Sequence, residues 1–220
     1  MPAQASSWAG LSFECSTEAG IVMRGVRAVY LAAAVVWLTP GIAPAADNVP
    51  AEMREKLETC AACHGPDGVS PNQEVPSLAA QPDIFTQWQL VYMRDGTRKV
   101  EAMEEVVKGM TDSDIRFYGS YFASLAAPVP EHPKLSDAES AEVLNLMKPR
   151  RCANCHDDTM AGKGEMPRLA GQRADYLVKA LRDYRSNARR GRGQAVMVEM
   201  VSTMTENDIN ILAEYLSRLP

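Results

Sequence analysis

The sequence predicts an all-α protein that consists of two tandem copies of one small helical domain. Three observations support this fold class. The pentapeptide Cys-x-x-Cys-His occurs twice, at residues 60–64 and 152–156. The landmarks that follow the first copy recur after the second at a nearly constant spacing. Apolar residues repeat at helical intervals, and no segment shows the polar–apolar alternation that is typical of a strand.

The internal repeat is seen when the two halves are aligned on His64 and His156. The shared landmarks include a Pro-x-Leu-Ala-x-Gln stretch, an arginine, two methionines and a final Asp-Ile segment. The matched pairs are Pro76/Pro167, Gln81/Gln172, Phe85/Tyr176, Arg94/Arg185, Met103/Met197, Met110/Met204, Ile115/Ile209 and Tyr121/Tyr215. The spacing between partners changes only from 92 to 91 to 94 residues. Such a duplication predicts two domains, over 47–125 and 135–220.

Each domain is expected to contain helices in the same order. The first helix leads into the pentapeptide and the second carries apolar residues at helical spacing, which predicts helices over 51–60, 138–147, 85–94 and 176–185. The last helix of each half should begin after Thr111 or Thr205, with Asp114 or Asp208 three residues on, in the pattern of a capping box. Between the domains, residues 126–134 contain three prolines, which predicts a stiff, extended linker.

Residues 1–46 have the features of a secretory signal peptide. Arg24 and Arg27 precede an apolar run over 28–38, and small residues follow at 43–46. This run is shorter than the roughly 20 apolar residues that span a bilayer, although an uncleaved anchor is the alternative. Met23 would begin a conventional signal peptide by itself, which makes it a candidate for the true start. The expected location is the bacterial periplasm.

The repeated pentapeptide is the attachment motif of c-type haem. The two thiols of each motif are expected to bond covalently to the haem vinyl groups, and these thiols belong to Cys60, Cys63, Cys152 and Cys155. The adjoining His64 and His156 are the expected proximal iron ligands. Zinc held by Cys-x-x-Cys pairs is the alternative, but it does not need a histidine directly after each pair. The fifth cysteine, Cys15, lies in the predicted signal segment.

The second axial position of each iron is predicted to be filled by methionine. The chain has three histidines, and the third, His132, lies in the linker, where an exposed position is expected. Met110 and Met204 stand directly before the predicted N-caps, where they would contact an isoleucine four positions into the helix. Met103 and Met197 have no comparable local role, so they are the predicted ligands. A thioether ligand raises the reduction potential of the iron.

Together these motifs resemble the di-haem cytochrome c4 family. The resemblance rests on the two haem motifs, the loop His64–Gly68, the Pro-x-Leu-Ala-Gly-Gln stretch that ends at Gln172, and the methionine and final helix of each half, and it covers about residues 50–220. It implies two cytochrome c-like domains related by a pseudo-twofold axis, with two haems close together. Two departures stand out. Asp157 follows the second histidine where glycine is expected, and Ala80 replaces the glycine that the second half keeps as Gly171.

The resemblance also implies a function. It is that of an electron carrier rather than an enzyme, loosely associated with the membrane, which receives electrons from a quinol–cytochrome c reductase type of donor and passes them toward a terminal oxidase or reductase. Candidate contacts to the haem propionates are Gln81, Arg94, Gln172 and Arg185. The alternatives are the cytochrome subunit of a flavocytochrome c sulfide dehydrogenase, and a di-haem peroxidase or thiosulfate-oxidising enzyme. The net charge of −5 gives no indication of nucleic-acid binding.

An arginine-rich segment over 182–192 has two interpretations. It contains five arginines against one aspartate. A solvated loop is one interpretation. The other is a docking patch, formed by Arg189, Arg190 and Arg192, that steers an acidic redox partner.

Overall fold

The computed structural model describes residues 49–220. The predicted signal segment over 1–46, including Met23, lies outside the described residues. Within 49–220 the regular structure is helical, and the one β feature of this range is an isolated bridge between Lys163 and Met166. The all-α prediction is confirmed. No helix of the described range is long and apolar enough to cross a membrane.

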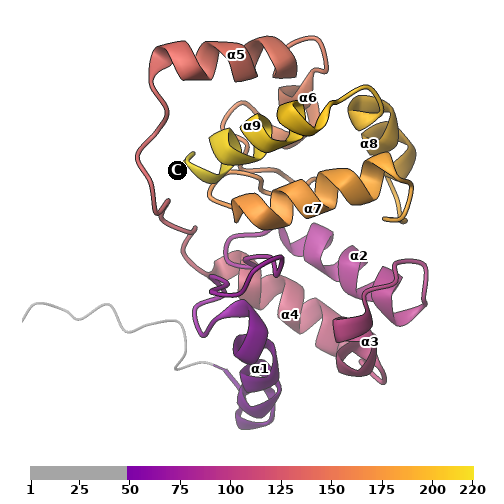
Figure 1. Cartoon of the computed structure of the whole chain (residues 1–220). Coiled ribbons are helices and arrows are strands. Elements are labelled where there is room, and N and C mark those ends of the chain that lie inside the picture. Colours follow the sequence, from indigo (N-terminus) through magenta and orange to yellow (C-terminus); the bar gives the residue numbers. More distant parts are fainter. Residues whose placement is uncertain (1–48) are drawn as a thin grey trace, which may run out of the picture. The chain divides into compact units, whose positions relative to one another are not determined.

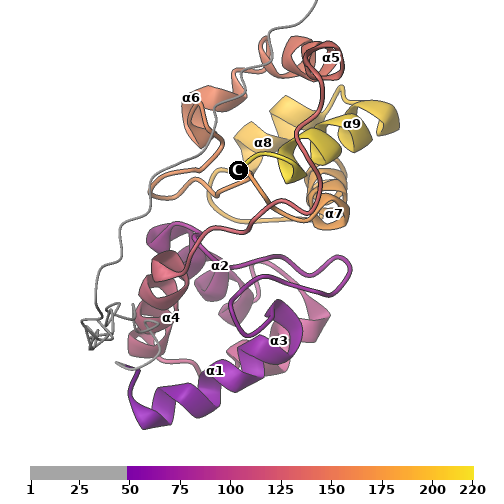
Figure 2. The same ribbon diagram turned by 90° about the vertical axis from the view of Figure 1, so that its left-hand side faces the viewer.

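The helices of the two halves follow one another in the same order. The first half holds α1 (Ala51–His64), α2 (Asp83–Arg94), α3 (Glu101–Val107) and α4 (Asp112–Ser124). The second half holds α5 (Asp137–Met147), α6 (Cys152–His156), α7 (Ala174–Arg185), α8 (Gln194–Val201) and α9 (Glu206–Ser217). Helix α2 packs on α4, and its counterpart α7 packs on α9. Figure 1 shows α1–α4 grouped together and α5–α9 grouped together, joined by the chain that leaves α4 and runs to α5 in both views (Figures 1 and 2).

Each half has a hydrophobic core of its own. In the first half the buried residues are Val49, Met53, Leu90, Val107, Ile115, Tyr118 and Phe122. In the second half they include Val143, Met147, Leu177, Val201, Ile209, Leu212 and Leu216. Ile115 and Ile209, which the repeat pairs, are 2% and 0% exposed. Two separate cores are what a duplicated small domain requires, because each copy must bury its own apolar faces.

The last helix of each half begins with the predicted capping box. Thr111 accepts a hydrogen bond from the backbone N–H of Asp114 at 3.1 Å, and the Asp114 carboxylate accepts from the N–H of Thr111 at 2.9 Å. Thr205 and Asp208 repeat both bonds, at 3.1 and 2.8 Å. These reciprocal bonds satisfy backbone donors that a helix start otherwise leaves unpaired.

The connection from the predicted helix over 138–147 to the second haem motif differs from the prediction. In the first half α1 runs unbroken through the motif, whereas in the second half α5 ends at Met147 and the motif forms the separate helix α6. The cause is Pro149, which has no N–H to donate and whose ring crowds the preceding turn. The chain then takes a left-handed conformation at Arg151, with φ of 51°, before α6 begins. The predicted helix over 138–147 is thus confirmed as α5, but it does not run into the haem motif as α1 does.

Candidate haem-binding site

The histidine of each motif is buried and oriented by a backbone carbonyl. The Nδ1 atom of His64 lies 2.8 Å from the carbonyl oxygen of Pro76, and that of His156 lies 3.0 Å from the carbonyl oxygen of Pro167. A ring that donates from Nδ1 keeps Nε2 as the metal-binding nitrogen, and the bond fixes the orientation of the ring. Burial lowers the pKa of both imidazoles, and the hydrogen bond only partly offsets this. The neutral form that ligates iron is therefore favoured.

A folded loop brings each proline carbonyl to its histidine. In the first half the carbonyl of Gly68 accepts from the N–H of Leu78 at 2.7 Å and of Ala79 at 3.1 Å. In the second half the carbonyl of Met160 accepts from the matched residues, Leu169 at 2.8 Å and Ala170 at 3.0 Å. These bonds close the loop directly after the haem motif. The two halves thus reach the same histidine contact through the same backbone pairing.

The cysteines occupy matched surroundings in the two halves. Cys60 and Cys152 are half-buried, whereas Cys63 and Cys155 are exposed. Burial raises the pKa of the Cys60 thiol to about 11 and also raises that of Cys152. Among residues 49–220 no three His, Cys, Asp or Glu side chains are grouped to hold a metal ion, so the two Cys-x-x-Cys pairs do not assemble a zinc site there. Two thiols one helical turn apart, followed by an oriented imidazole, fit covalently attached haem.

The predicted methionine ligands lie on two helices that the sequence did not predict. Met103 is on α3 and Met197 is on α8, and both are half-buried and pack against the core of their own half. Met110, the competing candidate, lines a cavity of about 190 Å³ together with Cys60 and Tyr118. The third histidine, His132, is exposed. Axial ligation by Met103 and Met197 stays a prediction.

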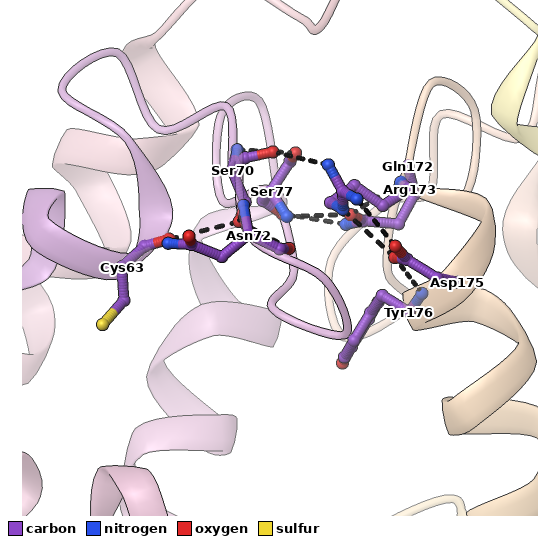
Figure 3. Close-up of polar contacts among 8 residues, drawn as sticks. All are labelled: Cys63, Ser70, Asn72, Ser77, Gln172, Arg173, Asp175 and Tyr176. Atoms are coloured by element: carbon purple, nitrogen blue, oxygen red, sulfur yellow. Dashed lines mark hydrogen bonds and ion pairs between the residues drawn. The ribbon is translucent and has the colours of Figure 1, made fainter.

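The matched glutamines form reciprocal contacts between the two halves. Gln172 accepts from the N–H of Ser77 and donates to its carbonyl, both at 2.8 Å (Figure 3). Gln81 donates to the carbonyl of Arg168 at 2.9 Å and accepts from its N–H at 3.1 Å. Ser77 and Arg168 are also matched by the repeat. The two contacts are therefore equivalent: a glutamine of each half binds the backbone of the matched residue in the other half. The predicted role of both glutamines as propionate contacts stays untested, and the structure uses their amides to join the halves.

Further hydrogen bonds connect the Gln172–Ser77 contact to the first haem motif. The N–H of Ser70 donates to the Ser77 hydroxyl at 3.1 Å, and Asn72 donates to the carbonyl of Cys63 at 2.8 Å. Arg173 of the second half donates to the carbonyl of Ser70 at 3.1 Å. Figure 3 shows these side chains between α1 and α7. The loop that carries the first histidine contact is therefore fixed partly by the second half.

The matched arginines Arg94 and Arg185 hold the start of the last helix. Arg94 donates to the carbonyl of Met110 at 2.8 Å and forms an ion pair with Asp112 at 2.9 Å. Arg185 donates to the carbonyl of Met204 at 2.9 Å and pairs with Glu206. The propionate role predicted for these arginines is also untested, and their guanidinium groups have these protein partners.

The arginine-rich segment does not form one exposed patch. Arg189 is 7% exposed and donates to the hydroxyl of Tyr176 and to Gln89, each at 3.2 Å. Arg192 lies over the ring of Trp88 at 5.8 Å and pairs with Glu165 at 2.9 Å. The hypothesis of a three-arginine docking patch is therefore wrong, because the segment packs against α2 of the first half.

This fold and this pair of sites define a class of protein, the di-haem c-type cytochromes. Residues 140–220 match the family model described as cytochrome c. The chain is 30% identical to cytochrome c4 of Pseudomonas aeruginosa, over 81% of this chain and 92% of that protein, and 30% identical to cytochrome c4 of Azotobacter vinelandii with the same coverages. The chain belongs to the cytochrome c4 family. It carries two covalently bound haem c groups, whose attachment motifs the cysteine pairs fit.

Two further matches bear on structure and partners. The crystal structure of reduced recombinant cytochrome c4 from Pseudomonas stutzeri matches with a TM-score of 0.68 and 28% identity, over 78% of this chain and 99% of that one. A protein of Thiomonas intermedia called thiosulfate dehydrogenase electron acceptor is 28% identical, over 91% of this chain and 93% of that protein. The chain is thus similar, over most of its length, to proteins that carry electrons.

Proposed function

We propose that this protein is a periplasmic electron carrier of a respiratory chain. Its donor is of the quinol–cytochrome c reductase type, its acceptor is a terminal oxidase or reductase, and it associates loosely with the membrane. The observation that carries this proposal is the matched histidine–carbonyl geometry at both haem motifs, with bond lengths of 2.8 and 3.0 Å. Two equivalent sites, each with a methionine on a second helix of the same half, suit electron transfer better than substrate binding.

The residues of the chain have distinct parts in this function. Haem iron bound at each site would supply one-electron chemistry. The carbonyls of Pro76 and Pro167 restrain rotation of the histidine rings that would hold the iron. Met103 and Met197 would serve as the second ligands and would leave no position open for a substrate. The contacts of Gln81 and Gln172 hold the two halves together, so that electron exchange between the haems does not depend on diffusion.

The test is an absorption spectrum of the oxidised, matured protein in the red region, where sulfur-to-iron charge transfer gives a weak band. We expect intensity for two haems. Met103→His and Met197→His should each remove half of this band and lower one reduction potential, because imidazole replaces a thioether. Met110→Leu and Met204→Leu are the matched controls and should leave the band intact. A high-spin signal in the parent protein would indicate an open iron and favour the peroxidase or thiosulfate-oxidising alternatives.

A second candidate partner follows from the comparisons. Because a relative is called a thiosulfate dehydrogenase electron acceptor, a thiosulfate-oxidising enzyme is a candidate donor for this chain. Rapid-mixing measurements of haem reduction by a quinol–cytochrome c reductase and by a thiosulfate dehydrogenase with thiosulfate would separate the two. Co-purification of flavin with the protein would instead favour the sulfide dehydrogenase alternative.

A further inference from the structure

The connection between α7 and α8 lies against α2 of the first half. This connection, residues 186–193, is longer than its match, because the spacing of the repeat grows across it from 91 to 94 residues. The guanidinium of Arg192 lies over the ring of Trp88, 5.8 Å from its centroid, and Gly191 contacts the ring of Tyr92. Trp88 and Tyr92 are one helical turn apart on α2, and their rings stack with centroids 5.5 Å apart.

Only glycine fits where the connection reaches Tyr92. Gly191 has φ of 137°, and a Cβ there would lie 2.8 Å from Cδ2 of the Tyr92 ring. Tyr92 is 9% exposed, so its ring has little room to move away. The shorter connection of the first half, residues 95–100, also contains a glycine, but a Cβ on Gly96 would meet nothing within 4 Å. This close approach of a glycine is therefore made in one direction, from the second half to α2.

The side chain of Arg192 is held from two sides. It pairs with Glu165 of the second half at 2.9 Å while it lies over Trp88 of the first half. The face of an indole ring attracts a guanidinium group, and the ion pair fixes where that group lies. One residue before Glu165, the carbonyl of Gly164 accepts from the N–H of Phe85, in the first turn of α2, at 3.1 Å. Two segments of the second half thus contact α2 between its first and last turns.

We propose that Gly191 and Arg192 are positioning residues, which fix α2 against the second half for electron exchange between the two haems. Domains of one chain move relative to each other unless their interface prevents it. Helix α2 packs on α4 and supplies Leu90 to the core of the first half, so a contact that fixes α2 fixes this half as a unit. Electron exchange depends on the distance and orientation of the haems, and this consequence rests on the proposed function.

Hydrogen exchange of three amides measures whether the halves separate. In the matured, reduced protein the N–H groups of Phe85, Ser77 and Arg168 each donate to an acceptor of the other half. In Arg192→Gln all three should exchange about fivefold faster, because a cation–π contact and an exposed ion pair are lost. Arg192→Lys keeps the positive charge and should restore part of the protection. Faster exchange at Phe85 alone would indicate local loosening and would overturn the proposal.

The second measurement is the rate of electron exchange between the haems, in matured protein that carries a single electron. Gly191→Val places a side chain against the Tyr92 ring and should slow this exchange by about fivefold. Both reduction potentials should stay close to the parental values, since no charge changes. Gly193→Ala is the matched control, because Gly193 also has a positive φ, of 75°, but a Cβ there meets nothing within 4 Å. Arg190→Gln removes an exposed arginine of the same connection. Both controls should keep the parental amide protection and exchange rate.

The two measurements separate this proposal from the proposed function. An unchanged rate in folded Gly191→Val, an equal slowing in Gly193→Ala, or unchanged amide exchange in Arg192→Gln would overturn the positioning role and leave the electron carrier intact. Parent haems that exchange no electrons with each other would overturn the positioning role and contradict the proposed function as well.

Discussion

The loops that follow the two haem motifs have positive φ angles at matched positions, but different residue types adopt them. After the first histidine, Gly65 takes φ of 82° and Gly68 takes φ of 76°. After the second, Asp157 takes φ of 71° and Met160 takes φ of 58°. Further along the chain the glycine is in the second half instead: Ala80 has φ of 55°, and its match in the repeat, Gly171, has φ of 67°. The backbone conformation is kept in both halves, whereas the residue type that adopts it easily is not.

The two loops also differ in the position at which only glycine fits without a backbone clash. A Cβ on Gly65 would lie 2.1 Å from the carbonyl oxygen of Val69. In the second half the crowded glycine is Gly162, whose Cβ would lie 2.4 Å from the carbonyl oxygen of Met166. Asp157 has φ and ψ of 71° and 164°, a region that almost only glycine occupies. Its carboxylate accepts from the N–H and hydroxyl of Thr159, both at 2.6 Å.

The largest expected effect comes from placing alanine at the matched positions Gly65 and Asp157. Gly65→Ala should destabilise the protein by about 3 kcal/mol, because it combines an unfavourable φ with a backbone clash. Asp157→Ala should have a clearly smaller effect, since the second loop already accommodates a Cβ there. Urea unfolding of both matured variants measures the difference, with Gly96→Ala as a control in open space. Equal losses at the two positions would mean that the loops do not differ in this way.

The next effect compares the two reciprocal contacts between the halves. Gln172→Ala should cost about 2 kcal/mol, because it leaves the N–H and carbonyl of Ser77 without partners. Ser77 is only 2% exposed. Gln81→Ala should cost less, since Arg168 is half-buried and water can replace the lost bonds. Calorimetry of both variants gives the comparison, and a larger loss in Gln81→Ala would contradict it.

Local signals predicted most of the fold. The capping boxes at Thr111 and Thr205 and the periodic segments that became α2 and α7 depend on neighbours in the chain, so the sequence reveals them. The short helices α3 and α8 were missed because seven or eight residues give too little periodicity to recognise. The end of α5 at Met147 was predicted, but the separate helix α6 after Pro149 was not.

Only part of the candidate site could be predicted, because some of its residues are contiguous in sequence and others meet only in the fold. The haem motifs are contiguous in sequence, so their cysteines and histidines could be named directly. The contacts that join the halves depend on which surfaces meet, and no pattern within one copy reports this. Gln172 was predicted to contact a propionate, which stays untested, and Arg189 was placed in an exposed patch. Neither prediction included the bonds that both side chains make to the other half.

The smallest expected effect concerns acid sensitivity at the two capping boxes. Lys56 and then Thr111 donate to Asp114 and lower its pKa to about 2. Asp208 has the threonine bonds without such a lysine, and its pKa is also lowered. A carboxyl group whose pKa is lower in the folded state contributes stability above its unfolded pKa near 3.9, and this contribution is lost as the pH falls through the folded value.

The first half should therefore lose this contribution between about pH 4 and pH 2. Asp114→Asn should remove at most about 1 kcal/mol of stability at neutral pH, since solvent screens the pair, and it should flatten the pH dependence in that window. Asp208→Asn should flatten it less. Unfolding midpoints followed from pH 5 to pH 2 measure both, and Lys56→Met should make the two boxes respond alike. If Asp208→Asn had the larger effect, the lysine would not be what distinguishes the two halves at this helix start.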